Sequence, residues 1–187
     1  MRREELAEIL GKVQRGEMGL EEAASRIAIE PVTDLGFAML DHHRELRKGL
    51  PEVVYCEGKH RDTIRPIVEA LLEKNQGNIL LTRASEEVYE EVRASCPQAE
   101  YHRQARFILI RREEKELAGK VVVITAGTAD IPVAEEAAIV AELTGNAVEK
   151  LYDVGISGMH RILARTDALI GANVAVVAAG MEGALPS

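Results

Sequence analysis

The feature that most constrains how this chain can fold is a pattern of strand, glycine turn and helix that repeats three times within residues 120–187. Residues 121–126 form a continuous, mostly β-branched run, which is typical of a strand buried on both faces of a parallel sheet. Further strands are predicted at residues 147–152 and 174–178, and a turn containing glycine follows each of the three runs. All three turns therefore lie at the carboxyl ends of strands, the edge where ligands bind in open α/β sheets.

The overall composition argues against several classes of function. The 187-residue chain carries a net charge of −8, which disfavours a general nucleic-acid binder because phosphate neutralisation needs a basic face. No apolar run approaches the roughly 20 residues needed to cross a bilayer, and the amino terminus lacks the apolar core of a secretory signal. The expected location is cytoplasmic, with neither membrane nor nucleic acid as a partner. Cys56 and Cys96 lack the spacing of a zinc site and are expected to be reduced thiols.

The amino-terminal part of the chain is predicted to be helical. Residues 4–28 indicate a helical hairpin, because apolar residues recur at helical spacing on both sides of a glycine-containing break at residues 16–19. Two short helices cannot bury both of their faces alone, so the hairpin is expected to pack on the body of the protein or on another subunit. Residues 31–36 are predicted to be a linker that leads into a short strand at residues 37–40.

A polar cluster follows at residues 41–44. Asp41, His42 and His43 are residue types that ligate metals. Neighbouring histidines point in different directions on a strand or a helix, so both cannot easily reach one ion. The favoured interpretation is a set of surface or anion-contacting groups, with further basic residues nearby.

Residues 53–111 alternate between strand and helix patterns, which predicts a second, smaller α/β unit. Its strands are expected at residues 53–56, 79–82 and 106–111, with a short extended piece near Tyr101, and its helices at residues 61–74 and 85–95. Ser85 is predicted to cap the second of these helices, and Arg83 is a candidate for contacting an anion.

The distribution of charge marks a boundary in the chain. Residues 1–118 hold 19 basic and 23 acidic residues, whereas residues 119–187 hold only 12 charged residues. The charged segment at residues 111–119 separates the two compositions. A charge-poor segment rich in Ala, Val, Ile and Gly suits a parallel sheet that is covered on both faces.

The first of the three turns, residues 127–130, places free backbone N–H groups at the start of a helix. Such a helix start can bind phosphate, and Asp130 could accept a hydrogen bond from a ribose hydroxyl. In the alternative interpretation Asp130 is only the N-cap of the helix, with Pro132 in its first turn. The sequence leaves both interpretations open.

The second turn, residues 155–161, brings His160 and Arg161 to another helix start. An imidazole supplies acid-base chemistry, and a guanidinium holds an anion. A lone histidine is more often structural, so this role also stays open.

The third turn, residues 180–186, sets Glu182 between two glycines. A backbone without side chains can approach a ligand closely there, and the carboxylate could act as an acid or base. The alternative is a solvated loop glutamate.

Taken together, the three turns resemble those of a known group of enzymes. Residues 126–130, 158–161 and 179–186 are similar to the loops of the aminoimidazole ribonucleotide carboxylases and mutases of purine synthesis. In those enzymes a histidine precedes the leucine-proline pair, where this chain has Ala184, and this chain has Glu182 instead. With these differences, and with residues 34–38 and 41–44 ahead of the α/β units, the sequence resembles the related LarB family, which begins synthesis of the nickel-pincer cofactor of lactate racemase.

The resemblance implies a fold and a domain organisation. The fold is α/β, a flavodoxin-like parallel sheet preceded by a smaller α/β unit and an amino-terminal helical hairpin. The expected boundaries are 1–30 for the hairpin, 31–112 for the small α/β domain and 119–187 for the start of a catalytic domain like aminoimidazole ribonucleotide carboxylase.

The resemblance also implies a reaction. The substrate would be nicotinic acid adenine dinucleotide, whose pyridinium ring is carboxylated with carbon dioxide or bicarbonate and whose phosphoanhydride is hydrolysed to release AMP. A divalent cation such as Mg²⁺ and a homo-oligomer, an octamer as in the purine relatives, are also implied. The predicted catalytic residues are Glu182, Asp153 and His160. The predicted substrate-binding residues are Gly127, Thr128, Asp130, Gly158, Arg161, Gly180, Met181 and Gly183.

Similar proteins continue for dozens of residues beyond the leucine-proline loop and carry there a cysteine that adds to the pyridinium ring. The chain as written is therefore expected to bind the dinucleotide weakly and not to carboxylate it. The alternatives to the main hypothesis are a purine-pathway carboxylate mutase or carboxylase, which Ala184 disfavours, and a non-catalytic nucleotide-binding or assembly module.

Overall fold

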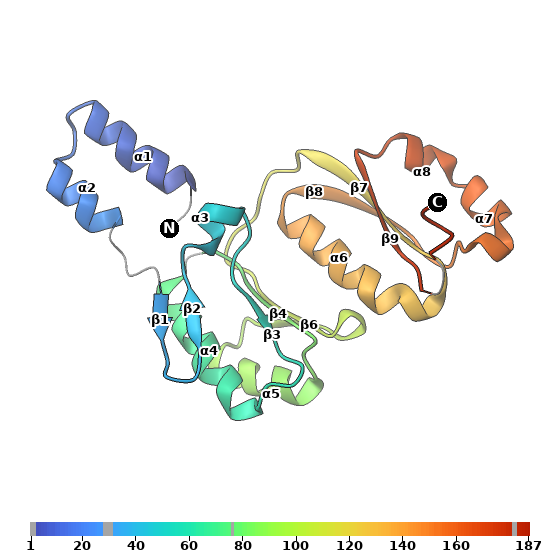
Figure 1. Ribbon diagram of the computed structural model, residues 1–187, viewed down its shortest axis with the longest axis horizontal. Coiled ribbons are helices and arrows are strands. Elements are labelled where there is room, and N and C mark those ends of the chain that lie inside the picture. The colour runs from blue at the N-terminus through green and yellow to red at the C-terminus, as the bar shows by residue number, and fades with distance from the viewer. Residues whose placement is uncertain (1–2, 28–31, 76, 181–182) are drawn as a thin grey trace. The chain divides into compact units, whose positions relative to one another are not determined.

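The computed structural model describes residues 3–27, 32–75, 77–180 and 183–187. They form two compact units (Figure 1). Unit 1 comprises the chain up to Glu100 together with Ile108–Arg112, and unit 2 comprises Tyr101–Phe107 and Glu113–Ser187. The finer domain boundaries expected from the sequence stay a prediction.

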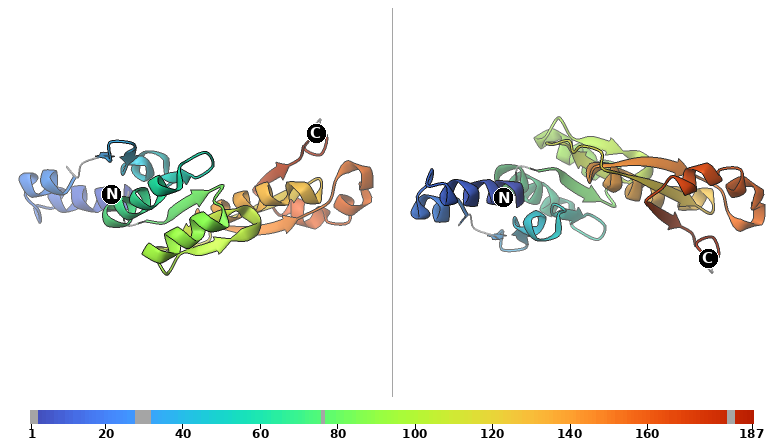
Figure 2. Two further views of the ribbon diagram at one scale, coloured as in Figure 1. Left: turned by 90° about the horizontal axis from the view of Figure 1, so that it is seen from below. Right: turned by 90° about the horizontal axis from the view of Figure 1, so that it is seen from above.

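The amino-terminal helical hairpin is confirmed within the described residues. Helix α1 spans Arg3–Gln14 and helix α2 spans Leu20–Ile27. The two helices contact each other and lie side by side in Figure 1, and Figure 2 shows the same hairpin from below and from above. Gly16 ends the first helix because it adopts a φ of 74°, a left-handed conformation that costs glycine little.

The segment predicted as a linker contains a strand. β1 (Val32–Asp34) pairs antiparallel with β2 (Met39–Asp41). The backbone N–H of Gly36 donates to Asp34 Oδ1 over 2.7 Å, and Gly36 adopts a φ of 80°. This tight turn makes a hairpin, so the linker prediction is wrong for residues 32–34, and the strand predicted at 37–40 begins only at Met39. Pro31, the first residue of the predicted linker, lies outside the described residues.

His42 is buried, which corrects its prediction as a surface group. Its ring is 6 % exposed, with Nδ1 2.8 Å from Asn75 Oδ1 and Nε2 2.8 Å from Thr33 Oγ1. Because an amide oxygen only accepts, Nδ1 carries the proton and Nε2 accepts from the threonine hydroxyl. His42 is thus a core hydrogen-bonding residue that ties β1 to the end of α4 (Arg61–Lys74).

A four-stranded mixed sheet lies mostly in unit 1, although its residues Tyr101, His102 and Phe107 belong to unit 2. Its strand order is β3-β4-β6-β5, with β3 and β4 parallel and β4 and β6 antiparallel. These strands span Val53–Tyr55, Ile79–Thr82, Phe107–Ile110 and Glu100–His102, close to their predicted positions. A 3₁₀ turn, η1, follows β5 at Arg103–Ala105.

The helices of unit 1 include two predicted from the sequence and one that was missed. α4 has its predicted bounds, and α5 (Glu86–Ser95) begins after Ser85, whose Oγ accepts from the Val88 N–H over 3.4 Å, so the predicted N-cap is confirmed. The additional helix is α3 (Arg44–Lys48), which follows the 41–44 cluster and ends at Gly49 in a left-handed conformation.

Both cysteines are free and buried, as expected of reduced thiols. Burial raises the pKa of Cys56 to about 11. In the part of the chain that the structure describes, no helix is both long enough and apolar enough to cross a membrane.

Unit 2 contains the predicted parallel sheet, with strand order β8-β7-β9. β7 spans Gly119–Thr125, β8 spans Asn146–Leu151 and β9 spans Val174–Ala178. The central strand pairs parallel with both neighbours, Val121 facing Val148 on one side and Val174 on the other.

Helices cover both faces of this sheet, as the apolar strand pattern predicts. On one face Val121 and Val123 pack against Ala134 and Ala138 of α6 (Ile131–Leu143). On the other face Val122 packs in a cluster with side chains from α7 (His160–Leu163) and α8 (Thr166–Ile170). The predicted α/β fold is confirmed. The first strand of this sheet in the chain, β7, lies between the second and the third, which is the strand order of a flavodoxin-like sheet.

Candidate active site at the carboxyl edge of the unit 2 sheet

The first turn leaves β7 and makes a 3₁₀ turn, η2 (Thr128–Asp130), before α6 begins. The carboxylate of Asp130 reaches back, because its Oδ2 accepts from the Gly127 N–H over 2.9 Å. Asp130 occupies the N-cap position of α6 but makes no side-chain capping bond to that helix. The N-cap position expected in one of the two interpretations is therefore observed, but the Asp130 carboxylate orders the backbone of the turn and does not cap α6.

The second turn is joined to the first by backbone hydrogen bonds. The N–H groups of Val154 and Gly155 donate to the carbonyl oxygens of Thr125 and Ala126, over 3.0 and 2.9 Å. A Cβ atom at position 155 would lie 2.6 Å from the Ala126 carbonyl oxygen. This close backbone approach is why the position requires glycine.

The third turn approaches the first from the other side. The Ala126 N–H donates to the Ala178 carbonyl oxygen over 3.2 Å. A Cβ atom at Gly180 would lie 3.9 Å from Asp130 Oδ1, so this backbone passes close to the aspartate. Gly183 turns the chain with a φ of 64°, and Leu185 packs against the buried cluster beneath the sheet.

Together the three turns line a pocket of about 610 Å³. The chain passes from the central strand β7 to β8 on one side and later to β9 on the other side. The pocket lies at the carboxyl end of β7, where these two directions diverge, and doubly wound sheets bind ligands at such a switch point. Its lining residues are Ala126, Gly127, Ala129, Asp130, Gly155, Ile156, Ser157, Ala179, Gly180, Ala184 and Leu185. The size suits a ligand of nucleotide dimensions.

The predicted site residues divide into three groups by position. Gly127, Asp130 and Gly180 line the pocket. A second group lies in or beside the same turns without lining it: Thr128, Asp153, Gly158, His160, Arg161 and Gly183. Met181 and Glu182 lie outside the described residues.

Within the second group, Asp153 and Arg161 form an ion pair. Arg161 Nη1 donates to Asp153 Oδ2 over 2.7 Å. The guanidinium also lies against Gly158, because a Cβ atom there would be 2.6 Å from Arg161 Nε. His160 begins α7 and is exposed to solvent.

Sequence reasoning missed most of the apolar lining of the pocket. Ala129, Ile156, Ala184 and Leu185 belong to turns that the sequence singled out, but an apolar side chain carries no chemical signal of its own. Gly155 and Ser157 could have been chosen, because they directly follow the second strand in a glycine-rich turn.

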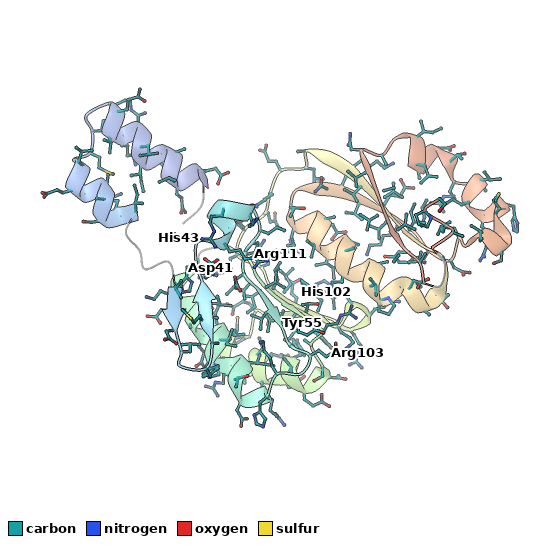
Figure 3. The ribbon with its side chains drawn as sticks, in the orientation of Figure 1. Asp41, His43, Tyr55, His102, Arg103 and Arg111 are labelled. Atoms are coloured by element: carbon teal, nitrogen blue, oxygen red, sulfur yellow. The ribbon has the colours of Figure 1, made fainter. Side chains whose placement is uncertain are left out.

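A second polar cluster lies in unit 1, where Asp41 and His43 are labelled in Figure 3. Asp41 Oδ1 accepts from the His43 N–H over 3.1 Å, and Oδ2 accepts from the Arg47 guanidinium. Burial raises the pKa of Glu52, although nearby Arg44 opposes that shift. Among the described residues no group of three His, Cys, Asp or Glu side chains could hold a metal ion, in this cluster or elsewhere.

The implied divalent cation would find one carboxylate in the described lining of the pocket. Asp130 is the one carboxylate among the lining residues of the described chain, and it already accepts from Gly127. Magnesium bound by protein takes one or two carboxylates together with substrate phosphates. The cation stays a prediction, and no step below passes through it.

Comparison with known proteins decides the family. Residues 32–113 match the model of the LarB/PurE-like N-terminal domain. An uncharacterized protein of Methanocaldococcus jannaschii is 36 % identical over 192 residues, an alignment that covers 97 % of this chain and 75 % of the relative. The chain belongs to the LarB family. Membership supports an enzyme of the carboxylase or mutase type in general terms, and the particular reaction is a separate question.

Proposed function

We propose that this LarB-family protein acts in the first step of nickel-pincer cofactor synthesis, in which the pyridinium ring of nicotinic acid adenine dinucleotide is carboxylated and its phosphoanhydride is hydrolysed to release AMP. Residues 1–187 lack the ring-adding cysteine of similar proteins, so these residues alone are expected to bind the dinucleotide weakly and not to carboxylate it. In the first reaction carbon dioxide, free or from bicarbonate, forms a C–C bond at the free meta carbon, and the ring proton leaves. In the second, water adds to phosphorus and the bridging P–O bond breaks.

The observation that carries the proposal is the convergence of three glycine turns on one pocket. The carboxyl ends of β7, β8 and β9 all contribute to it. Gly127, Gly155 and Gly180 line the pocket without side chains, so a ligand can approach the main chain there. The η2 turn that leads into α6 contributes Ala129 and Asp130 to the pocket, and this turn is the place we propose for a substrate phosphate.

Four of the predicted residues have proposed chemical roles. Asp130 orders the first turn and lies where a ribose hydroxyl can donate to it. Arg161 and His160 are proposed to contact phosphate and to exchange protons, respectively. Glu182 is proposed to position the attacking water. In the predicted homo-oligomer the α1–α2 hairpin would have a second surface to cover.

Ala184 distinguishes the proposal from the purine-pathway alternative. It lines the pocket with a methyl group where the purine enzymes carry an imidazole. A mutase that relies on that imidazole for proton transfer would lack it here. No observation on the described residues favours the non-catalytic binding module over the enzyme.

The test is to incubate the protein with nicotinic acid adenine dinucleotide and ¹³C-bicarbonate, and to follow AMP and a dicarboxylated mononucleotide by mass spectrometry. Carboxyaminoimidazole ribonucleotide is the competing substrate in a parallel reaction. Turnover of the purine substrate alone would overturn the proposal. In active protein Glu182→Gln should abolish AMP release while dinucleotide binding persists, and Glu142→Gln, on the exposed face of α6, is the matched control.

A further inference from the structure

Thr125, the last residue of β7, carries a hydroxyl group that no proposed chemical role uses. Its side chain is fully buried, at 0 % exposure. Burying a hydroxyl is unfavourable unless it is hydrogen-bonded. Here Thr125 Oγ1 accepts from the backbone N–H of Asp153 over 2.9 Å, while the Thr125 carbonyl oxygen accepts from Val154 over 3.0 Å. One buried residue therefore holds two consecutive amides of the second turn.

Asp153 needs such a restraint. Its φ is 58°, in the left-handed region that is uncommon for residues other than glycine and is tolerated best by Asn and Asp. The hydrogen bond from its N–H fixes the backbone there. That backbone fixes the position of the Asp153 Cβ atom, from which the carboxylate extends.

The carboxylate in turn holds Arg161. Oδ2 of Asp153 lies 2.7 Å from Arg161 Nη1. The guanidinium occupies the space beside Gly158, where any side chain would collide with it. Gly158 directly follows Ile156 and Ser157, which line the pocket. The arginine is thereby held next to the turn that borders the pocket.

We propose that Thr125 is a positioning residue that acts through Asp153: its buried hydroxyl sets the left-handed backbone of Asp153, whose carboxylate orients the Arg161 guanidinium beside the pocket. Asp153 then has a positioning role rather than a direct chemical one. The inference rests on the proposed function in one respect, which is that Arg161 contacts a substrate phosphate.

The test uses a double-mutant cycle between Thr125 and Arg161. Thr125→Val removes the acceptor at similar volume, and Thr125→Ser keeps it. Thr125→Val should weaken affinity for nicotinic acid adenine dinucleotide about three- to tenfold by calorimetry, the loss expected for one hydrogen bond of ordinary strength. Thr125→Ser should restore affinity to within about twofold, and Thr125→Val should cause no further loss in Arg161→Ala protein. An equal loss in both backgrounds would overturn the inference, because Thr125 would then act on the fold in general.

A second measurement does not depend on the ligand. The Nε–H resonance of Arg161, assigned by its absence in Arg161→Lys, should shift or broaden in Thr125→Val and remain in place in Thr125→Ser. Asp153→Gly accepts the left-handed backbone without strain and should change the same resonance even if Thr125→Val fails to fold. An unchanged resonance in Asp153→Gly or in folded Thr125→Val contradicts the inference. If wild-type protein binds no dinucleotide, the proposed function fails, and this resonance alone decides the role of Thr125.

Discussion

Units 1 and 2 both start helices at the carboxyl ends of parallel strands, but they treat those helix starts differently. After β4 in unit 1, Ala84 is fully buried and Ser85 caps α5 with its own hydroxyl. After β7 in unit 2, the side chain of Asp130 reaches back to Gly127 and leaves α6 without a side-chain cap. The first helix start is thus capped by a side-chain hydroxyl, whereas the second continues from a 3₁₀ turn that a carboxylate orders.

The turns differ in backbone as well as in capping. In unit 2 Gly155 and Gly180 both line the pocket, and Gly155 lies directly against the Ala126 carbonyl oxygen. In unit 1 Gly58, which follows β3, has open space around it and serves a turn with a φ of 77°. Charged residues are concentrated in residues 1–118, yet the described pocket of unit 2 is lined mostly by small side chains. Glycine at strand ends is therefore a better guide to this site than charge.

The largest expected effect is on the stability of unit 1. Leu81 in β4 is 0 % exposed, and Leu81→Ala should lower the free energy of unfolding by about 2–5 kcal/mol in urea denaturation. Dinucleotide affinity, measured where the variant is still folded, should not change. Leu20→Ala, at a side chain that is 77 % exposed, is the control with little effect on stability. A loss of dinucleotide affinity in folded Leu81→Ala would contradict the proposal that the ligand binds at the unit 2 sheet and not at the unit 1 sheet.

The next effect is on binding at unit 2. Arg161→Ala should weaken dinucleotide affinity by about 1.5–3 kcal/mol, because it removes a charge-assisted contact to phosphate. Arg61, at the start of α4 in unit 1, is ion-paired with Glu91 at 3.3 Å, and Arg61→Ala should leave affinity unchanged. Calorimetry of both variants checks the pair. A similar loss of affinity in the two variants would contradict the proposal that the dinucleotide binds at the unit 2 sheet and not at the unit 1 sheet.

A smaller but localised effect is expected at Gly155. Gly155→Ala places a methyl group against the Ala126 carbonyl oxygen, and such overpacking costs about 1–3 kcal/mol. Thermal unfolding should show the loss, together with weaker dinucleotide binding. Gly19→Ala, at a position with no neighbour within 4 Å, should be tolerated. If Gly155→Ala retains wild-type stability, the backbone approach of the two turns is not a constraint.

The smallest effect concerns pH. Burial raises the pKa of Glu135, but hydrogen bonds from Lys150 and Tyr152 lower it by more, so the folded-state pKa lies below its usual value. Its stabilising contribution is present above the unfolded-state pKa of about 4.3 and is lost as pH falls through the folded-state value. Glu135→Gln should therefore lose less stability than wild type on acidification, by about 0.5–1 kcal/mol.

Urea denaturation at neutral pH and at several acidic values measures this difference. Glu90→Gln, on the exposed face of α5 in unit 1, should follow the wild-type curve. Identical acid sensitivity in Glu135→Gln and wild type would show that the Lys150–Glu135–Tyr152 contacts contribute nothing measurable.

The sequence by itself determined the order of the helices and strands, and it indicated the carboxyl edge of the parallel sheet as the candidate site. Periodicity located α4, β4 and β9 at their observed bounds, because apolar runs and flanking glycines are local signals. It also selected Gly127, Asp130 and Gly180, since residues at the carboxyl ends of parallel strands meet at one edge. The β1–β2 hairpin was missed because short strands are stabilised by their partner rather than by their own composition.

Only the tertiary structure decided what individual polar groups do. His42 looked like a surface residue until its ring was found between Thr33 and Asn75. Thr125 carried no signal at all, because a threonine at the end of a strand is ordinary until the amide of Asp153 is found on its hydroxyl. Periodicity is written into neighbouring residues, whereas a hydrogen bond between residues far apart in the chain exists only once the sheet has aligned them.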